Sequence, residues 1–266
     1  MLSSEEIERY QRHLVLKEIG GAGQQKLKKT KVLVVGAGGL GSSVVMYLAA
    51  AGIGTIGIID DDTVSLSNLQ RQVIYTTTQT GRSKVDSAAK FINMLNPHVH
   101  VVPISEKLDA HNALKIISDY DIVADGSDNF KTRYLVNDAC YLAKRPLVFA
   151  AVGPFDGQLT TFKSYEKNEK GLPNPNYRCL FPEDPTTEDN PNCEQVGILG
   201  SVVGVMGSMQ ATEVLKESVG IGQSLVGRLL IFDAKMMRFE TMTYGWAPDN
   251  PLNGKLPIYK DLSHFL

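Results

Sequence analysis

The sequence contains few cysteines, little net charge and no long apolar run. Among its 266 residues there are three cysteines, an odd and low number that excludes a disulfide framework and favours a reducing compartment. The formal net charge of -2 gives no reason to expect a nucleic-acid or membrane partner. No apolar stretch approaches the ~20 residues that cross a bilayer, and the charged start MLSSEEIERYQRH does not resemble a signal peptide. We therefore expect a cytoplasmic protein.

Hydrophobic residues make up 43% of the chain and charged residues 21%, a balance typical of a globular fold. The chain is long enough to bury a sizeable core, and it contains no internal repeat. We predict one domain over residues 1–266. Its parts are a helical segment at 1–30, a nucleotide-binding core at 31–160, a mobile crossover loop at 166–194, and a C-terminal region at 195–266 with a helix and antiparallel strands.

The stretch KVLVVGAGGLGSSVVMYLAAAGIGTIGIIDDD, residues 31–62, predicts a strand, a glycine-rich turn, a helix and a second strand. Gly36 can make the tight turn, Gly38 lets a phosphate approach the backbone, and Gly41 lets the helix lie close to the sheet. The helix N-terminus offers free N–H groups and the positive end of a dipole to an anion. Asp60 ends the second strand, where an acid can accept hydrogen bonds from ribose hydroxyls. The pattern indicates nucleotide binding, although an α/β core with a glycine-rich turn and no ligand has the same pattern.

Elsewhere, helical and strand patterns alternate along the chain. Helical spacing occupies 4–18, where Ser3 or Ser4 can cap the helix, while GGAG at 20–23 predicts a break before a short basic helix. Apolar runs predict further strands at 99–104, 120–129 and 147–152, and a hairpin at 228–245. We therefore predict an α/β fold with a doubly wound, mostly parallel Rossmann-like sheet, continued by antiparallel C-terminal strands.

Charged side chains gather at the predicted carboxyl edge of this sheet. Asp125 and Asp128 follow a strand, so they share that edge with the glycine turn and Asp60. Arg71 and Lys84 come soon after the second strand. Backbone amides and a helix dipole commonly suffice for the pyrophosphate of a dinucleotide, whereas a triphosphate carries more charge and requires cations and Mg²⁺. The two cations, and the lack of an edge histidine or lysine suited to hydride chemistry, count against an NAD-dependent oxidoreductase.

Four segments together resemble the MoeB/ThiF/HesA family, bacterial relatives of ubiquitin-activating enzymes. They are RYQRHLVLKEIGGAGQQKL, VLVVGAGGLGSSVVMYLAAAGIGTIGIIDDDTVSLSNLQRQ, GRSKVDSA and DGSDNFKTRYLVNDAC. The similarity extends from about Arg9 to about Thr243, most of the chain. The resemblance implies an adenylyltransferase that uses ATP and Mg²⁺ to adenylate the C-terminal glycine of a ubiquitin-like sulfur-carrier protein ending in Gly-Gly. Such a reaction serves molybdopterin or thiamine biosynthesis.

The resemblance also implies roles for individual residues. Asp60 holds the ribose, Asp128 positions Mg²⁺, and Arg12 reaches the phosphates bound by the neighbouring subunit of a homodimer. For Arg12, a solvated helix charge is the alternative. The residues that contact the nucleotide or its phosphates are Gly38, Gly39, Gly41, Asn68, Arg71 and Lys84.

Cysteine positions distinguish this chain from many members of that family. Cys193 lies where some members carry a cysteine that links to the carrier or takes part in sulfur transfer, and an exposed loop cysteine without a role is the alternative. Many relatives hold a structural zinc with two C-x-x-C pairs. Here the first pair is Asn176-Tyr177-Arg178-Cys179 and the second falls near Asn250-Pro251-Leu252-Asn253. One thiolate of four cannot form a Cys₄ site, so we expect no structural zinc and a less restrained crossover loop.

Three other functions stay open. The same ATP site could activate another carboxylate or an RNA-borne substrate, although the low positive charge counts against RNA. A NAD-dependent oxidoreductase and a nucleotide-binding subunit without catalysis are the others. No rhodanese-like segment is found in the sequence, so we expect a separate protein to supply the sulfur. The identities of the carrier, the pathway and the sulfur donor are left open.

Overall fold

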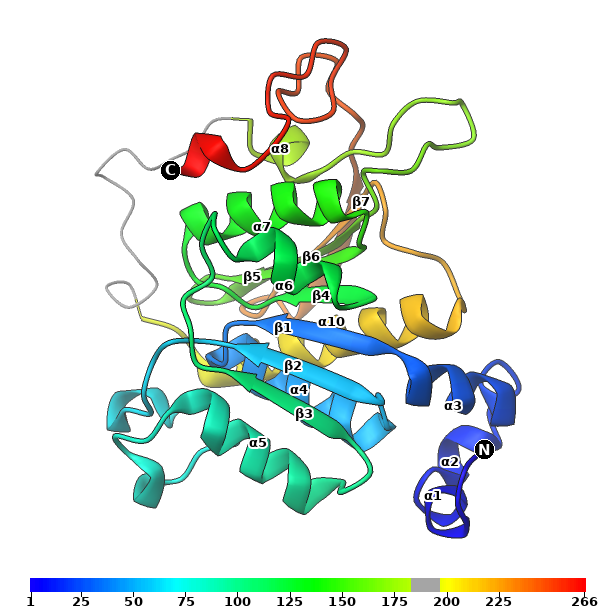
Figure 1. The fold of residues 1–266 in the computed structure, drawn as a ribbon, viewed down its shortest axis with the longest axis vertical. Helices are drawn as coiled ribbons and strands as arrows, with labels where there is room; N and C mark the ends of the chain where they lie inside the picture. The colour runs from blue at the N-terminus through cyan, green and yellow to red at the C-terminus, as the bar shows by residue number, and fades with distance from the viewer. Residues whose placement is uncertain (183–196) are drawn as a thin grey trace.

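The computed structural model describes residues 1–182 and 197–266 (Figure 1). One eight-stranded sheet runs through the molecule in the order β3-β2-β1-β4-β5-β6-β7-β8. The strands are β1 (Lys31–Val35), β2 (Thr55–Ile59), β3 (His100–Ile104), β4 (Ile122–Asp125), β5 (Leu147–Val152), β6 (Asp156–Phe162), β7 (Arg228–Asp233) and β8 (Arg238–Thr243). Strands β1 to β5 pair in parallel, and β6, β7 and β8 pair antiparallel. The predicted fold class is confirmed.

Helices cover both faces of the sheet. They are α1 (Ser4–Arg9), α2 (Gln11–Leu14), α3 (Gly20–Lys29), α4 (Gly39–Ala51), α5 (Lys84–Leu95), α6 (Ala113–Ser118), α7 (Phe130–Ala143), α8 (Tyr177–Leu180) and α10 (Gly200–Val219). Short 3₁₀ turns lie at Leu66–Asn68, Thr77–Gln79 and Ser263–Phe265. In the part of the chain that is described, no helix is long and apolar enough to cross a membrane.

The parallel strands are apolar on both faces because each face is buried under helices. In β1, Val32 and Val34 belong to the cluster that includes side chains of α4, α5 and α10. Leu33 and Val35 point the other way and belong to the cluster beneath α6 and α7. All four side chains are buried. This alternation explains the uninterrupted apolar run that predicted the strand.

Strand order reverses between β1 and β4. From β1 the chain winds through β2 to β3, then returns through β4 to β5 on the other side of β1. The loops after β1 and β4 therefore diverge to opposite faces and open a crevice at the carboxyl ends of these strands. Ligands bind in such crevices in open α/β sheets.

The N-terminal region differs from its prediction. Ser3 caps α1 in a capping box with Glu6, as the sequence indicated, but the predicted single helix is divided into α1 and α2. The predicted break at GGAG is wrong, because α3 begins at Gly20. A Cβ atom on Gly23 would lie 3.1 Å from side-chain atoms of Ile19 and Val219. Glycine at this position therefore allows α3 to pack closely against the end of α10, and does not interrupt the helix.

The predicted crossover loop is more structured than expected where it is described. It contains α8, and the side chains of Asn176, Tyr177 and Arg178 are buried. Tyr177 packs among the aromatic rings of Tyr134, Phe149 and Phe181. We expected a mobile, less restrained loop over 166–194, and in the described part of it a few large buried side chains anchor this stretch. Residues 183–196 lie outside the described part.

Candidate functional site

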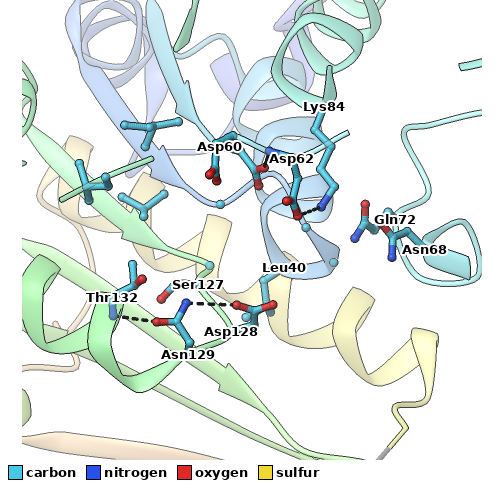
Figure 2. Close-up of a pocket in the computed structure, with 18 of the residues that line it drawn as sticks. Leu40, Asp60, Asp62, Asn68, Gln72, Lys84, Ser127, Asp128, Asn129 and Thr132 are labelled. Carbon is cyan, nitrogen blue, oxygen red and sulfur yellow. Dashed lines mark hydrogen bonds and ion pairs between the residues drawn. The ribbon is translucent and has the colours of Figure 1, made fainter. Parts of the chain in front are cut away.

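A pocket opens at the crevice between β1 and β4 (Figure 2). Its walls come from the β1–α4 turn, the end of β2, the turn that follows it, the start of α5 and the β4–α7 loop. These segments are far apart in the sequence. The predicted site residues that line the pocket are Gly38, Gly39, Asp60, Asn68, Arg71, Lys84 and Asp128.

The glycine turn shapes the floor of this pocket. Gly36 has a φ of 87°, a left-handed conformation that glycine adopts without strain. A Cβ atom on Gly41 would collide with the carbonyl oxygen of Gly36, so Gly41 closes the turn and does not itself line the pocket. At Gly38, by contrast, the nearest atom that a Cβ would meet among the described residues is Gln72 Nε2, 3.8 Å away. Gly38 is the N-cap of α4, so the first amides of this helix lie beside open space that an anion can enter.

Asp60 ends β2 and holds the glycine turn in place. Its Oδ2 accepts a hydrogen bond of 2.7 Å from the Ala37 amide, and its Oδ1 accepts one of 2.8 Å from the Asp62 amide. The Tyr75 hydroxyl donates to the carbonyl oxygen of Ala37 over 2.8 Å, so both backbone polar groups of Ala37 are held. Burial raises the pKa of the Asp60 carboxyl, and the positive charge of Lys84 opposes that shift. Each carboxylate oxygen keeps a lone pair for a further donor.

The cations come from the segment after β2. Lys84 is the first residue of α5, and its Nζ lies 2.8 Å from Asp62 Oδ2. Its amide donates to the carbonyl oxygen of Asp62 over 3.0 Å. The Asp62 carboxylate thereby offsets the unfavourable position of a lysine at the positive end of a helix dipole. The guanidinium of Arg71 donates from Nη1 to the carbonyl oxygen of Ser67 over 3.2 Å.

A second group of polar side chains follows β4. Figure 2 shows Ser127, Asp128 and Asn129 on the side of the pocket opposite Asp60 and Lys84. Asn129 caps α7 by accepting a 2.9 Å hydrogen bond from the Thr132 amide, and its Nδ2 lies 3.4 Å from Asp128 Oδ1.

Asp125 fixes the loop beneath this group. Asp125 is buried at the end of β4, where its Oδ1 accepts a 2.9 Å hydrogen bond from the Ser127 amide. Burial raises the pKa of the Asp125 carboxyl. The Nη2 atom of Arg133 donates to the carbonyl oxygen of Ser127 over 3.3 Å, which holds the loop from the side of α7.

Several residues that line the pocket or support its walls were not predicted. Asn129 could have been found from the sequence, because Asn is a preferred N-cap residue and Asn129 directly precedes the helix α7. Gln72 is 3% exposed, and its Oε1 has no hydrogen-bond partner among the residues described. A buried acceptor of this kind that lines a pocket can accept a hydrogen bond from a ligand. Gln210 of α10 donates from Nε2 to the carbonyl oxygens of Asp125 and Val148, at 2.8 and 2.9 Å, a contact that no local sequence pattern indicates.

Oxygen ligands for a divalent cation are present in the pocket. The carboxylates of Asp60, Asp61 and Asp62 offer ligand atoms that lie within 4.8 Å of one another. Asp128 contributes a further exposed carboxylate from the opposite side. Mg²⁺ is bound in proteins through one or two carboxylates together with phosphate oxygens and water. The residues present therefore fit a magnesium ion that is bound together with a nucleotide.

Arg12, a predicted site residue, stands apart from the pocket. Arg12 is exposed on α2, which precedes α3 and therefore lies near the amino-terminal end of β1, away from the pocket at its carboxyl end (Figure 1). Within its own subunit Arg12 does not line the pocket. Cys193 falls outside the described residues. Cys140 is buried among the side chains beneath α7, where burial raises the pKa of its thiol, as expected for a small apolar core residue.

The arrangement suits a polyphosphate better than a group that needs proton transfer. Free amides at the start of α4 and two cations face one region, and the described residues that line the pocket include no histidine and no cysteine. Such a site stabilises negative charge with fixed dipoles and positioned cations.

Comparisons with known proteins agree with this arrangement. The family model described as the ThiF family matches residues 10–252. The chain is 45% identical over 260 residues to the sulfur carrier protein adenylyltransferase of Thermus thermophilus, covering 98% of this chain and 95% of that protein. It is 44% identical over 255 residues to the SAMP-activating enzyme E1 of Haloferax volcanii, covering 96% and 91%. The crystal structure of E. coli MccB with ATP has a TM-score of 0.79 and 22% identity, and covers 95% of this chain and 75% of that one, which shows a shared fold.

Proposed function

The chain belongs to the ThiF family, and we propose that it adenylates the C-terminal carboxylate of a ubiquitin-like sulfur-carrier protein with ATP, releasing pyrophosphate. The observation that carries the proposal is the meeting of the glycine turn, Arg71, Lys84, Asp60 and Asp128 in one pocket. The names of the relatives from Thermus thermophilus and Haloferax volcanii support the same reaction. The product serves molybdopterin or thiamine biosynthesis in this proposal.

The chemistry explains why the pocket needs no base. The nucleophile is the carboxylate of a C-terminal glycine, which is already ionised at pH 7. It attacks the α-phosphorus of ATP, a new P–O bond forms to the carboxylate, and the bond to the β-phosphate oxygen breaks with pyrophosphate as the leaving group. Negative charge builds up on the α-phosphoryl oxygens and on the pyrophosphate. Positioned cations and amides that face this charge lower the barrier.

Each wall of the pocket has a part in this reaction. The amides at Gly38 and Gly39 receive phosphate oxygens, and Asp60 accepts hydrogen bonds from the ribose. Arg71, Lys84 and the neighbouring Asn68 hold the charged phosphates. Gly41 acts indirectly, because it closes the turn that aims those amides.

Asp128 and the acids at the end of β2 supply oxygen ligands for Mg²⁺. When bound, the ion neutralises phosphate charge and favours departure of the pyrophosphate.

We further propose a homodimer with two composite sites. Arg12 lies outside the pocket of its own subunit, on the short helix α2 at the other end of β1. A partner subunit could present the same arginine to the phosphates, which would join each site to the neighbouring chain. A separate protein supplies the sulfur, the enzyme acts in the cytoplasm, and Cys193 is retained as a candidate for a covalent or sulfur-transfer step. The proposal includes no structural zinc.

ATP–pyrophosphate exchange tests the proposed reaction directly. Purified chain is assayed with Mg²⁺ in the presence and absence of sulfur-carrier proteins that end in Gly-Gly. Exchange that requires one carrier would support acyl-adenylate formation and identify the pathway. ATP binding without exchange on any carrier would favour another carboxylate or a subunit without catalysis. Failure to bind ATP, with binding of NAD, would overturn the proposal.

A further inference from the structure

Three asparagines from distant parts of the chain meet beside a cysteine. Asn176 caps α8, whereas Asn250 and Asn253 lie in the C-terminal segment, and all three side chains are buried. Cys179 lies at the third position of α8 and is partly buried. We call Asn176, Asn250 and Asn253 the asparagine cluster. With Cys179 they fall at the four positions where the family resemblance implies two C-x-x-C zinc pairs in many relatives.

The donor set does not fit a structural zinc ion. Such sites use four thiolates or imidazoles in tetrahedral geometry. Here one thiol and three carboxamides are present, and the carboxamides are neutral and weak ligands for zinc. Their atoms are also engaged with one another. The four side chains therefore do something other than bind that metal.

Hydrogen bonds join the asparagines directly. Asn250 Nδ2 donates to Asn176 Oδ1 over 2.8 Å, and Asn176 Nδ2 donates to Asn253 Oδ1 over 3.1 Å. Asn253 Nδ2 donates to the carbonyl oxygen of Asn174 over 3.1 Å and lies 3.4 Å from that of Ser164. Each amide nitrogen and each amide oxygen of the three side chains has at least one hydrogen-bond partner. A buried network in which every polar atom has a partner is stabilising, whereas one with unpaired atoms is not.

Backbone groups complete the arrangement on each side. Asn250 Oδ1 accepts from the Leu252 amide over 2.9 Å, and Asn176 Oδ1 accepts from the Arg178 amide over 2.9 Å. The Cys179 Sγ atom lies 3.1 Å from Asn250 Nδ2 and 3.4 Å from the amide nitrogen of Ala247, so it acts as an acceptor. These turns present the side chains to one another.

We propose that the asparagine cluster is a metal-free cross-link that fastens the C-terminal segment to α8 and, through α8, to α7. The second link is direct: the Tyr177 amide donates to Asn137 Oδ1 of α7 over 2.9 Å. The end of the chain is thereby tied to the helix that follows the Asp128 loop. The stability of this region depends on amide hydrogen bonds and is independent of zinc.

Zinc content and chelation test the native chain. Protein is produced in zinc-supplemented medium, and its zinc content is measured together with Tm before and after treatment with EDTA. We expect substoichiometric zinc and an unchanged Tm. Zinc close to one ion per chain, with a Tm that falls when the ion is removed, would overturn the proposal.

A single substitution tests the contribution of the network. Asn250→Ala removes the donor to Asn176 and the acceptor for Leu252 and leaves buried groups unpaired, so Tm should fall by about 4–10 °C. Asn93→Ala on the exposed side of α5 is the matched control and should leave Tm nearly unchanged. A Tm for Asn250→Ala equal to that of the control would overturn the proposal. Loss of folded Asn250→Ala protein beside a folded control would support it.

Replacing the three asparagines with cysteine tests whether these positions can cross-link the two segments. The triple variant N176C/N250C/N253C, with the native Cys179, provides four thiolates in reducing buffer. We expect it to bind about one zinc per chain, with a Tm that rises on zinc addition and falls with EDTA. A variant that neither binds zinc nor gains stability from it would show that the four positions do not form a cross-link. Both readouts are independent of adenylation.

Discussion

The ammonium group of Lys84 lies 2.8 Å from Oδ2 of Asp62, and the two side chains differ widely in exposure, at 6% and 69%. Asp62 therefore holds a buried lysine in place from the solvent side. Because Asp62 is largely hydrated, a phosphate can take over the lysine at low cost. The pair thus holds Lys84 in position for the phosphate contact that we propose.

Replacing Lys84 with methionine should abolish most activity without unfolding the protein. Met keeps the apolar stem in its buried position, and Asp62 is exposed enough to remain unpaired. Loss of one positioned cation should lower the rate of ATP–pyrophosphate exchange by roughly 10²–10³-fold. Lys90→Met, at an exposed position of the same helix, is the control and should keep normal exchange. Exchange by Lys84→Met within a few fold of wild type would contradict the assignment.

Two glycines of the same turn should respond differently to alanine. Among the described residues, a Cβ atom on Gly38 makes only an ordinary contact with Gln72 Nε2 at 3.8 Å. It enters the space proposed for a phosphate, so Gly38→Ala should fold normally and raise the Kd for ATP at least ~10-fold. A Cβ atom on Gly41 would strike the carbonyl oxygen of Gly36, so Gly41→Ala should lower Tm. Thermal melts and ATP titrations separate the two effects. Equal ATP affinity in Gly38→Ala and wild type would refute the phosphate role.

Local patterns predicted the fold and most of this pocket. Apolar strands alternating with helices imply a parallel sheet, and carboxyl ends of parallel strands share an edge, so Asp60 and Asp128 could be placed together. Lys84 and Arg71 follow β2 closely, which limits where they can lie. The turn glycines were read from their spacing. In each case the signal is contained within a short stretch of chain.

Contacts between distant segments could not be predicted from the sequence. Gln210 anchors Asp125 from α10, and Asn250 reaches Asn176, but nothing in the spacing of these residues reports such pairing. The prediction at GGAG failed because glycine was taken to weaken a helix, whereas Gly23 makes room for Val219. Tertiary packing overrides helix propensity in such places.

Stability should depend on pH through Asp125. Burial raises the pKa of its carboxyl above the ordinary value of 3.8. As the pH rises above 3.8, the unfolded chain releases this proton before the folded chain does. The free energy of unfolding therefore falls with pH until the raised pKa of the folded state is passed. An asparagine in place of Asp125 would keep an oxygen for the Ser127 amide but has no proton to lose. In urea denaturation, the free energy of unfolding of Asp125→Asn should therefore increase relative to that of wild type as the pH increases from about 4 to 7.

The control for that series is Asp119→Asn, which changes an exposed carboxyl at the end of α6. The gain of Asp125→Asn over wild type with rising pH should exceed any change shown by this control. A gain for Asp125→Asn no larger than the change in the control would mean that the buried carboxyl does not titrate differently in the two states.

A buried ion pair should dominate the stability of the α7–α8 contact. Asp138 is fully buried and accepts hydrogen bonds from Arg178 Nε and Nη2, at 3.0 and 2.8 Å, while His264 Nε2 lies 2.8 Å away. Asp138→Leu leaves the Arg178 guanidinium buried without its carboxylate, which should cost about 3–5 kcal/mol in the free energy of unfolding. Adding Arg178→Met should restore part of that loss.

The exposed pair of Arg238 and Glu240, 3.1 Å apart, is the matched control for the buried one. Glu240→Ala should change the free energy of unfolding by no more than ~1 kcal/mol. For the buried pair, the outcome that contradicts the prediction concerns the double variant Asp138→Leu with Arg178→Met. If its loss of stability equals the sum of the losses of the two single variants, Asp138 and Arg178 contribute independently.

Arg12 should act on the site of the partner subunit. Arg12→Ala and Asp128→Ala should each be inactive alone, because every site then lacks one of the two residues. A mixed dimer contains one site with the Asp128 of one chain and the Arg12 of the other, and this site is intact. When the two variants are co-expressed in equal amounts, half of the dimers are mixed and each has one working site of two. Carrier-dependent exchange should therefore recover to about one quarter of the wild-type rate.

Co-expression of Arg12→Ala with the double variant R12A/D128A is the control, since no chain then supplies the arginine. That mixture should stay inactive. An arginine that acted within its own subunit would leave both mixtures inactive, because the Arg12→Ala chain would lack it and the Asp128→Ala chain would lack the acid. Recovery in the first mixture alone requires that Arg12 cross the subunit boundary, as expected from its position on α2, outside the pocket of its own chain.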